Sequence, residues 1–311
     1  MSFREGRKLG KPFVVTKEEL AEFHVLSAEE TAEFLEQEKP REPEKREGLT
    51  MEQAETIMGT DFLGPEAVEK TFGIKLNEEQ IPEIPFSEAD LERAKELGQM
   101  LVLRVEKTAD DEPMSLEAMN AILVKKWQKE GKGNLLNTSD NWKKWLGQDL
   151  FTKETPRKGW SLVSKDLLPE STNKNYLEQT EIIIATLKNE VFKDKEMPKE
   201  YIEAIADFES KKVGLTKLID KDWKKAAKEL SGLDITKLTR QTFSEVIYDL
   251  AIYHSINNKR LLPNKYTSSA SLDPDGGVVD LGGFDAGGVY GDGWFPGRRC
   301  GGLGVSFSRS L

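Results

Sequence analysis

The amino-acid sequence predicts an α+β fold in which a helix-rich N-terminal region precedes a small antiparallel sheet flanked by two helices. Stretches with helix-capping residues and apolar side chains at helical spacing recur from residue 16 to residue 257. Residues 267–311 differ, because they hold nearly half of the chain's 25 glycines and no lysine. Short runs that alternate apolar and polar residues there, separated by glycine-rich turns, are typical of strands with one buried face.

The composition narrows the class of protein. The chain has 311 residues and a net charge of −10, which argues against sequence-independent binding of nucleic acid. It has one cysteine, Cys300, so neither an intrachain disulfide nor a thiolate metal cluster can form. No run approaches ~18 apolar residues, and the charged N-terminus lacks the apolar stretch of a signal peptide. We therefore expect a cytoplasmic protein with no membrane insertion.

Residues 1–48 are predicted to form short helices and a linker. Thr16 with Glu19 and Ser27 with Glu30 fit the capping-box spacing, which indicates helices at about 17–23 and 28–38. Residues 36–48 then read EQEKPREPEKREG, which is charged, broken by proline and free of apolar side chains. Such a segment cannot offset its ordering entropy by burial, so it is predicted to be an exposed linker.

Residues 49–150 are predicted to form an α-rich accessory domain. Capping residues at Thr50, Gly64 with Pro65, Ser87 and Ser115 predict four helices, which begin after them. The apolar run at 100–105 predicts one short buried strand.

Residues 151–311 are predicted to form the ligand-binding domain. The pattern predicts a strand at 159–164 and helices at 176–191, 201–208, 223–230 and 242–257. Trp142, Trp145 and Phe151, near the join, are interpreted as packing the two regions together rather than as a ligand platform. The lysines between 211 and 228 alternate with acidic residues and are interpreted as a solvated face.

The alternation in the tail divides its side chains between two directions. The inward set is expected to be Val279, Leu281, Leu303, Val305 and Phe307. The outward set is expected to include Val278, Asp280 and Ser306, together with the turn residues and Tyr290, Asp292, Phe295, Arg298, Arg299 and Cys300. That outward mixture includes the Tyr and Arg types enriched at binding hot spots, which favours a contact surface over a loose glycine-rich hairpin. The strand at 160–164 is expected to pair with the one at 303–308.

Few residues carry catalytic or metal-binding chemistry. Of the two histidines, His254 is interpreted as a satisfied core residue and His24 as a surface residue, because neither has metal-ligand spacing. Arg298 and Arg299 would activate the Cys300 thiol, but no general base is assigned beside it. Asp273, Asp275 and Asp280 are ingredients of a calcium site whose spacing is incomplete. No catalytic residue, cofactor or metal is therefore predicted.

The tail resembles that of the variable proteins of diversity-generating retroelements. The likeness is carried by NNKRLLPNKYTSSAS, DGGVV, GGF, GGV, GWFPG and the closing LGVSFSR. GWSLVSKDLLPESTNKNYLEQTE, and more weakly EAVEKTFGIKL and PFSEADLERAKE, resemble the region upstream of such tails. The resemblance implies a C-type-lectin-like C-terminal domain with a variable tail at 276–309. The segment Lys265-Tyr266-Thr267 stands where many relatives have a tryptophan-rich segment, so the resemblance does not imply how this loop packs.

The resemblance also implies which positions are diversified. The retained frame would be Gly282, Phe284, Gly288, Val289, Trp294, Pro296, Leu303, Gly304, Val305, Phe307, Ser308 and Arg309. The diversified, ligand-binding positions would be Asp280, Asp285, Tyr290, Asp292, Phe295, Arg298, Arg299, Cys300 and Gly301. The hypothesis is thus a non-enzymatic protein that binds an unidentified ligand, a protein or other macromolecule. Two alternatives are a structural or calcium-dependent interaction protein without diversification, and an enzyme of the formylglycine-generating type, which would need a second cysteine.

Overall fold

The computed structural model describes residues 49–137 and 140–310. The chain divides into two compact units, Met1–Glu47 and Gly48–Leu311, and the described residues belong to the second. The helices and linker predicted for residues 1–48 lie outside the described residues. None of the helices in the described part is long and apolar enough to cross a membrane.

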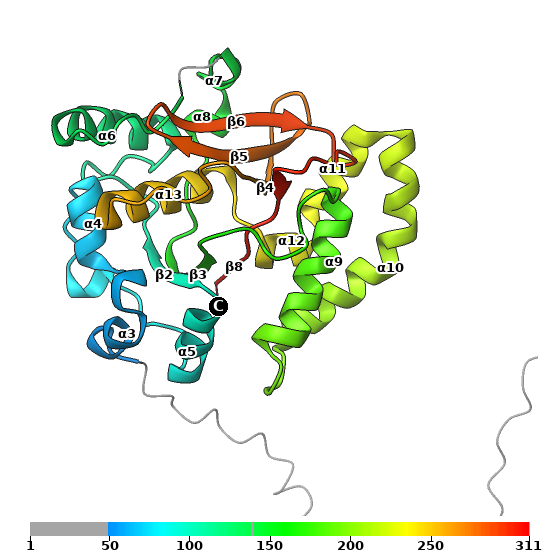
Figure 1. The fold of residues 1–311 in the computed structure, drawn as a ribbon, viewed down its shortest axis with the longest axis horizontal. Coiled ribbons are helices and arrows are strands. Elements are labelled where there is room, and N and C mark those ends of the chain that lie inside the picture. The colour runs from blue at the N-terminus through cyan, green and yellow to red at the C-terminus, as the bar shows by residue number, and fades with distance from the viewer. Residues whose placement is uncertain (1–48, 138–139, 311) are drawn as a thin grey trace, which may run out of the picture. The chain divides into compact units, whose positions relative to one another are not determined.

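The second unit is a mixed α/β structure with two four-stranded sheets (Figure 1). The first sheet has the order β1-β2-β3-β8 and comprises β1 (Phe62–Leu63), β2 (Gln99–Arg104), β3 (Gly159–Ser164) and β8 (Ser308–Arg309). β1 and β2 are parallel, whereas the β2–β3 and β3–β8 pairs are antiparallel. All six residues of β2 are buried, as its continuous apolar run predicts for a strand covered on both faces.

The second sheet has the order β6-β5-β4-β7 and contains the glycine-rich tail. Its strands are β4 (Tyr266–Leu272), β5 (Val278–Asp285), β6 (Gly288–Trp294) and β7 (Leu303–Gly304). The first three form an antiparallel meander, but β7 lies parallel to β4. The prediction of a single antiparallel sheet was therefore wrong. The loop after Trp294 carries the chain back across the sheet, so that β7 runs in the same direction as β4.

The end of the chain connects the two sheets. β7 belongs to the second sheet, and four residues later β8 joins the first, where Val163 pairs with Ser308 and Leu162 with Arg309. The expected pairing of 160–164 with 303–308 is thus confirmed only at Ser308, and the second paired residue, Arg309, lies just beyond the predicted strand. Arg309 is 2% exposed, and its guanidinium donates to Asp90 on α5 at 3.0 Å.

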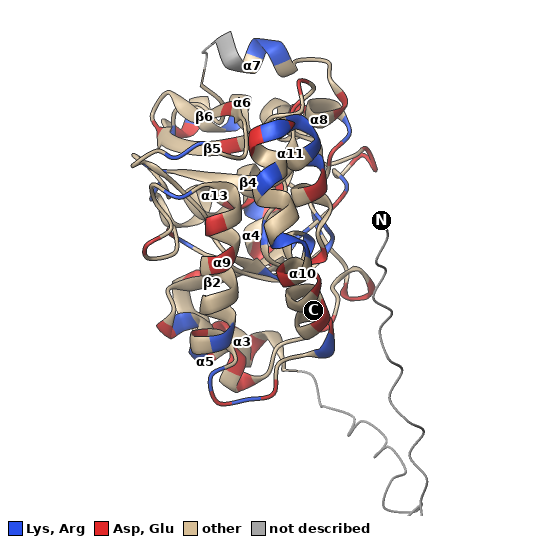
Figure 2. Ribbon diagram, turned by 90° about the vertical axis from the view of Figure 1, so that its right-hand side faces the viewer, with Lys and Arg blue, Asp and Glu red and all other residues tan. Residues whose placement is uncertain are grey.

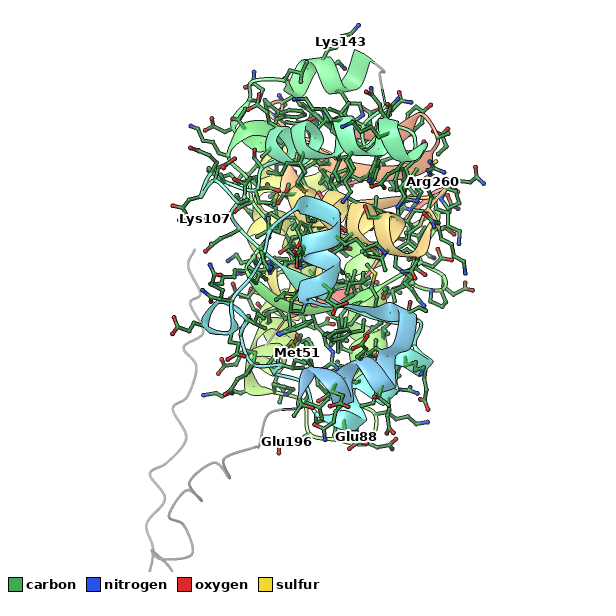
Figure 3. All side chains as sticks on the ribbon, turned by 90° about the vertical axis from the view of Figure 1, so that its left-hand side faces the viewer. Met51, Glu88, Lys107, Lys143, Glu196 and Arg260 are labelled. Atoms are coloured by element: carbon green, nitrogen blue, oxygen red, sulfur yellow. The ribbon has the colours of Figure 1, made fainter. Side chains whose placement is uncertain are left out.

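The first four helices before β3 begin at the predicted capping residues, whereas the two short helices at 140–145 and 149–152 were not predicted. The helices are α3 (Met51–Met58), α4 (Pro65–Phe72), α5 (Glu88–Glu96), α6 (Leu116–Glu130), α7 (Asp140–Trp145) and α8 (Asp149–Thr152), with short 3-10 turns at Gly59–Asp61 and Glu78–Gln80. Thr50 and Ser87 form the predicted capping boxes, and Ser115 caps α6. Met51 on α3 and Lys143 on α7 lie far apart in the view of Figure 3, with the packed side chains of the core between them.

The central helix is α13 (Phe243–Asn257), which is buried from Phe243 through Ser255. It contacts β2 of the first sheet and both β4 and β5 of the second. One hydrophobic core therefore runs from Ala54 to Val289. Residues on both sides of the boundary predicted near residue 150 share this core and the first sheet.

A second group of helices packs beside the tail. It comprises α9 (Tyr176–Thr186), continued by a π-helical turn at Leu187–Val191, then α10 (Lys199–Lys221), α11 (Trp223–Gly232) and α12 (Asp234–Thr239). Their apolar faces form a second core with Val278, Val305 and Phe307. α10 extends well beyond the predicted 201–208. Acidic and basic residues alternate over α10 and α11, as Figure 2 shows, and pairs such as Lys211 with Asp207 confirm the interpretation of a solvated face.

Candidate ligand-binding surface

A pocket of about 270 Å³ lies on the face of the second sheet that is turned away from α13. Its walls come from β4, β5, β6 and the loop that connects β6 to β7. The lining residues are Tyr266, Asp280, Tyr290, Gly291, Asp292, Trp294, Arg298, Cys300 and Leu303. Five of the nine positions predicted to be diversified, namely Asp280, Tyr290, Asp292, Arg298 and Cys300, therefore meet at one pocket.

The alternation along β5 explains the position of the pocket. Val279 and Leu281 are fully buried and belong to the core with α13, so Asp280 between them points to the opposite face. Asp280 pairs with Ser268 of β4 and with Asp292 of β6. It lies in the middle of the meander, with a neighbouring strand on either side.

Three residues expected to face solvent are buried instead. Val278, Asp280 and Ser306 are each about 5% exposed or less. The expectation assumed a sheet with one covered face, whereas helices and the β6–β7 loop cover much of the second face. Val278 packs against the second core, and the Ser306 hydroxyl donates to Gln241 at 2.7 Å. The five residues expected to face inward are all buried.

Asp280 is an unusual carboxyl group for such a position. Burial raises its pKa from 3.8 to about 7, although a hydrogen bond from Ser268 and the charges of Arg298 and Arg240 act in the opposite direction. The Asp280 carboxyl therefore titrates near neutral pH, and the charge at the floor of the pocket changes as it loses its proton. Arg240, which donates a hydrogen bond to the Ser268 carbonyl at 3.1 Å, supplies the second, buried positive charge near Asp280.

Arg298 and Cys300 form one wall of the pocket. The Arg298 guanidinium lies 3.1 Å above the ring centroid of Trp294, a cation–π contact that holds it in place. Its Nη1 is buried and has no hydrogen-bond partner among the residues that the structure describes. A hydrogen bond from the Gly302 backbone, aided by Arg298, lowers the pKa of the Cys300 thiol. The thiol is partly exposed.

The other predicted positions lie outside the pocket. Arg299 is exposed and makes a bidentate ion pair with Glu178 on α9, at 2.9 and 3.0 Å. Asp285 is exposed in the β5–β6 turn, where it accepts a hydrogen bond from the Gly287 backbone. Gly301 is exposed near the pocket rim, and Phe295 is 45% exposed on the far side of the loop.

The residues assigned to the retained frame are mostly inside the protein. Phe284, Val289, Val305 and Phe307 are fully buried. Gly282 is required by close packing, because a β-carbon there would lie 1.9 Å from the Lys265 carbonyl oxygen on β4's edge. The remaining frame positions, Gly288, Pro296, Leu303, Gly304, Ser308 and Arg309, are also buried. Trp294 is the exception at 37% exposure.

Comparison with known proteins adds no assignment to this surface. No family model, curated protein or solved structure matches the chain. The chemistry of the pocket is therefore defined by its own residues, which offer a carboxyl of shifted pKa, a guanidinium, a thiol and three aromatic rings. This mixture suits hydrogen-bonded and stacked contacts with a ligand.

The histidines and aspartates considered for metal binding do not gather at one place in the part of the chain that the structure describes. His254 is buried, as predicted, with Nε2 3.2 Å from the Lys132 carbonyl oxygen and its ring edge-on to Trp127. It is satisfied only in part, because its Nδ1 has no hydrogen-bond partner among the described residues. Burial lowers its pKa. His24 lies outside the described residues. Within 49–137 and 140–310, no three His, Cys, Asp or Glu side chains are placed to hold one metal ion, and this includes the aspartates at 273, 275 and 280.

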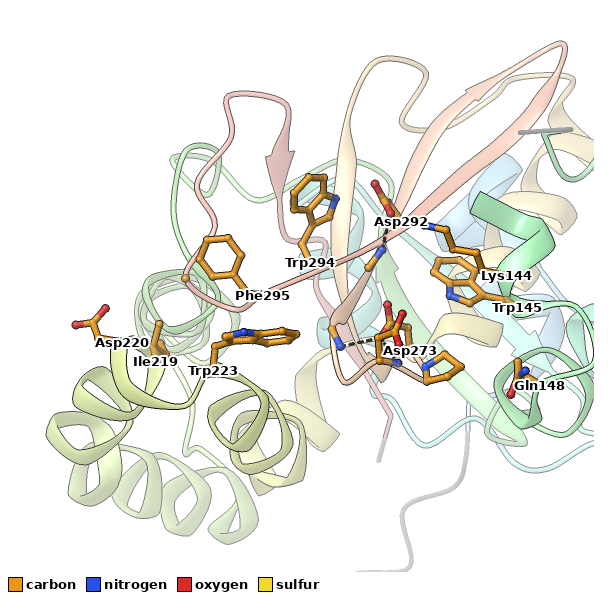
Figure 4. Close-up of a pocket in the computed structure, with 15 residues that line it drawn as sticks. Lys144, Trp145, Gln148, Ile219, Asp220, Trp223, Asp273, Asp292, Trp294 and Phe295 are labelled. Atoms are coloured by element: carbon orange, nitrogen blue, oxygen red, sulfur yellow. Dashed lines mark hydrogen bonds between the residues drawn. The ribbon is translucent and has the colours of Figure 1, made fainter. Parts of the chain in front are cut away.

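A larger groove of about 830 Å³ lies beside the pocket (Figure 4). It is lined by Lys144, Trp145, Gln148, Ile219, Asp220, Trp223, Asp273, Pro274, Asp275, Gly277, Asp292, Gly293, Trp294, Phe295 and Gly297. Asp292 and Trp294 line both cavities. Trp145 lines the groove at one edge and is itself buried. Trp142 and Phe151 are buried as well, which confirms that these aromatic residues pack inside the protein.

Sequence reasoning missed two parts of this surface. Tyr266 lines the pocket but belongs to β4, whose run YTSSASL lacks the apolar alternation that signals a strand. Trp223 lines the groove from the first turn of α11, where the sequence indicates only a helix. A tryptophan at the start of a helix, next to a polar turn, was the available signal.

Proposed function

We propose that this protein is a non-enzymatic ligand-binding protein whose ligand enters the pocket of the second sheet. We further propose that it is a variable protein of a diversity-generating retroelement, with a C-type-lectin-like C-terminal domain as its tail sequence implies. The observation that carries the proposal is the meeting of five predicted diversified positions around one pocket. They come from two strands and a loop that span 21 residues of sequence, 280–300.

The division between side chains that hold the fold and side chains that meet a ligand supports the same proposal. The frame residues Phe284, Val289, Val305 and Phe307 are fully buried, whereas Tyr290, Asp292 and Cys300 are partly exposed around the pocket. Exposed substitutions typically change stability by about 0.5 kcal/mol, while buried large-to-small ones cost about 2–5 kcal/mol. The partly exposed side chains of the pocket, Tyr290, Asp292 and Cys300, can therefore change at little cost to the fold.

The scaffold also favours binding by a fixed backbone. β5 is paired on both sides, by β4 and β6, so the backbone under the pocket has little freedom. A preorganised backbone lowers the entropy lost on association. The loop that carries Arg298 and Cys300 is held by the hydrogen bond from Asn173 N to the Cys300 carbonyl at 2.9 Å and by that from Tyr176 N to the Pro296 carbonyl at 3.0 Å.

A display experiment tests ligand binding. One library randomises Tyr290, Asp292, Arg298, Arg299 and Cys300, and a matched library randomises the same number of buried frame positions. We expect the first library to stay largely folded, measured by protease resistance, and to yield binders to one immobilised protein such as lysozyme. We expect the second library to lose protease resistance. Equal loss of fold in the two libraries would overturn the division between frame and surface.

The gene itself tests diversification. We expect a near-copy of the segment that encodes residues 276–309 beside a reverse-transcriptase gene, with differences only where the copy has adenine. A complete genome that holds this gene and lacks any such copy would count against the retroelement, while leaving the pocket as a binding site.

A further inference from the structure

The groove beside the pocket has a chemistry of its own. Its rings are Trp223 at the start of α11, Trp294 at the end of β6 and Phe295 in the loop that follows. Trp294 and Phe295 are two of the few large apolar side chains that are well exposed in the described part of the chain, at 37% and 45%. In Figure 4, Phe295 and Trp294 lie over Trp223 at one end of the groove, and Trp145 and Lys144 lie at the other. Exposed rings gathered from separate elements mark an interaction site.

The groove is also strongly acidic. Four of its lining residues are aspartates, Asp220, Asp273, Asp275 and Asp292, whereas Lys144 is its single lysine or arginine. None of the four aspartates forms an ion pair with a lysine or arginine in the part of the chain that the structure describes. Such carboxylates repel phosphate and attract cationic groups.

Asp273 occupies the middle of the groove, between Trp223 and Trp145 (Figure 4). Its Oδ1 accepts backbone hydrogen bonds from Gly277 at 2.7 Å and from Asp275 at 3.0 Å, which fixes the side chain. Its Oδ2 lies against the backbone of β6, where a β-carbon at Gly293 would be only 1.7 Å away. Glycine at 293 therefore makes room for a carboxylate whose second oxygen accepts no hydrogen bond from the residues described.

The rings already attract the cations of the protein itself. Arg298 covers one face of Trp294 at 3.1 Å, and the Lys224 ammonium lies 5.4 Å from the Trp223 ring centroid. These contacts show that cations approach the indole faces at this end of the groove. A guanidinium or ammonium from a partner would find a ring and a carboxylate together, the combination that holds cations best.

We propose that this groove, named here the Trp223 groove, binds a basic peptide segment of a protein partner. An arginine or lysine side chain of the segment lies between Trp223 and Asp273, and apolar side chains contact Phe295 and Ile219. Trp223, Ile219 and Asp273 precede the tail 276–309, so diversification of the tail would leave these three residues unchanged. The inference does not rest on diversification of the tail or on a ligand in the pocket.

Fluorescence anisotropy on the full chain tests the proposal. The probe is a labelled peptide of about twelve residues with arginines spaced by leucine and serine, and its control carries glutamate in place of each arginine. We expect the basic peptide to bind and the acidic one not to bind. Raising the salt from about 0.05 to 0.3 M is expected to weaken binding at least threefold, because screening reduces the attraction between exposed charges.

Substitutions locate the binding site. Asp273→Asn keeps the oxygen that accepts the turn hydrogen bonds and removes the charge, so we expect about three- to fivefold weaker binding with an unchanged melting temperature. Trp223→Leu removes the ring and keeps apolar bulk, and we expect about five- to tenfold weaker binding. Glu92→Gln, an equal change of charge on the exposed face of α5, far from α7 and α11 in Figure 1, is expected to bind like the unchanged protein.

Three results would overturn the proposal. The basic peptide fails to bind, or the acidic peptide binds equally well, or Asp273→Asn and Trp223→Leu bind as tightly as Glu92→Gln. Binding of a neutral oligosaccharide that is insensitive to salt, in place of the peptide, would assign the rings to a different ligand. Failure of the randomised pocket library would leave these measurements unaffected, so the two proposals fail separately.

Discussion

Replacing Asp280 with asparagine is expected to stabilise the protein at pH 8. Asp280 is 5% exposed, and burial raises its pKa from 3.8 to about 7. The folded state therefore keeps the proton to higher pH than the unfolded state does. Between about pH 4 and pH 7 the folded state binds more protons, so the free energy of unfolding falls as the pH rises. The contribution of Asp280 to the free energy of unfolding is therefore greatest below about pH 4 and is lost as the pH rises toward 7.

The magnitude follows from the difference in pKa. Raising the pKa of Asp280 from 3.8 to about 7 lowers the free energy of unfolding at pH 8 by about 4 kcal/mol, because each pH unit between the two pKa values contributes about 1.4 kcal/mol. Near pH 5 the loss is about 2 kcal/mol, because only the interval from 3.8 to 5 contributes. Asparagine can still accept the hydrogen bond from Ser268 and does not ionise. We therefore expect Asp280→Asn to exceed the unchanged protein in stability by about 4 kcal/mol at pH 8 and by about 2 kcal/mol at pH 5.

Urea unfolding of both proteins at pH 5 and pH 8 measures the effect. The comparison of two proteins at each pH cancels the titration of all other groups. Asp285→Asn, an exposed carboxyl in the β5–β6 turn, serves as the control and is expected to change stability equally little at both pH values. A stability gain of Asp280→Asn that is the same at both pH values, or a loss at pH 8, would refute the assignment of Asp280 as a buried carboxyl with a raised pKa.

Three further predictions concern the tail. Phe307→Asp places an unpaired charge in the second core and is expected to lower the free energy of unfolding by more than about 4 kcal/mol. Tyr290→Ala should change the same quantity, measured by urea unfolding, by less than about 1 kcal/mol. Equal losses in the two variants would contradict the division between frame and surface. Gly282→Ala forces a methyl group against the Lys265 carbonyl and should lower the free energy of unfolding by about 3 kcal/mol, and an unchanged value would show that β4 and β5 can separate there. Cys300, whose pKa is lowered, should react with iodoacetamide at pH 7.5 several times faster than free cysteine, measured by mass spectrometry; an equal or slower rate would argue against the stabilised thiolate.

Much of the helical structure could be predicted because its signals are local. The capping boxes at Thr50, Ser87, Asn175 and Thr242 each begin a helix in the structure. A capping box involves residues three apart, so a single sequence contains all of it. β7 pairs with residues 37 positions away, and β8 pairs with residues 145 and 147 positions away, which the sequence pattern of a two-residue strand cannot specify.

The interior charges show a second limit. Arg104 ends an apolar run and is fully buried, where it pairs with Asp249 of α13 at 2.5 Å and with Glu245 at 3.2 Å. Desolvation of a buried ion pair is costly unless further hydrogen bonds satisfy it, and here Ser161 and Gln241 supply them. Sequence periodicity places these side chains on the correct elements but does not reveal that they meet. For the same reason Asp280 was expected on an exposed face, since covering of that face by distant helices is a tertiary property.

The pocket and the Trp223 groove meet at the end of β6, so one partner can contact both. Asp292 and Trp294 line both cavities, so a partner bound in the groove lies directly beside the pocket. If both proposals hold, binding in the groove raises the effective concentration of the partner at the pocket. A newly altered pocket would then need only a weak contact to change the choice of partner. The groove residues that precede the tail, Ile219, Trp223 and Asp273, would supply affinity, and the diversified side chains would supply the difference between one partner and another.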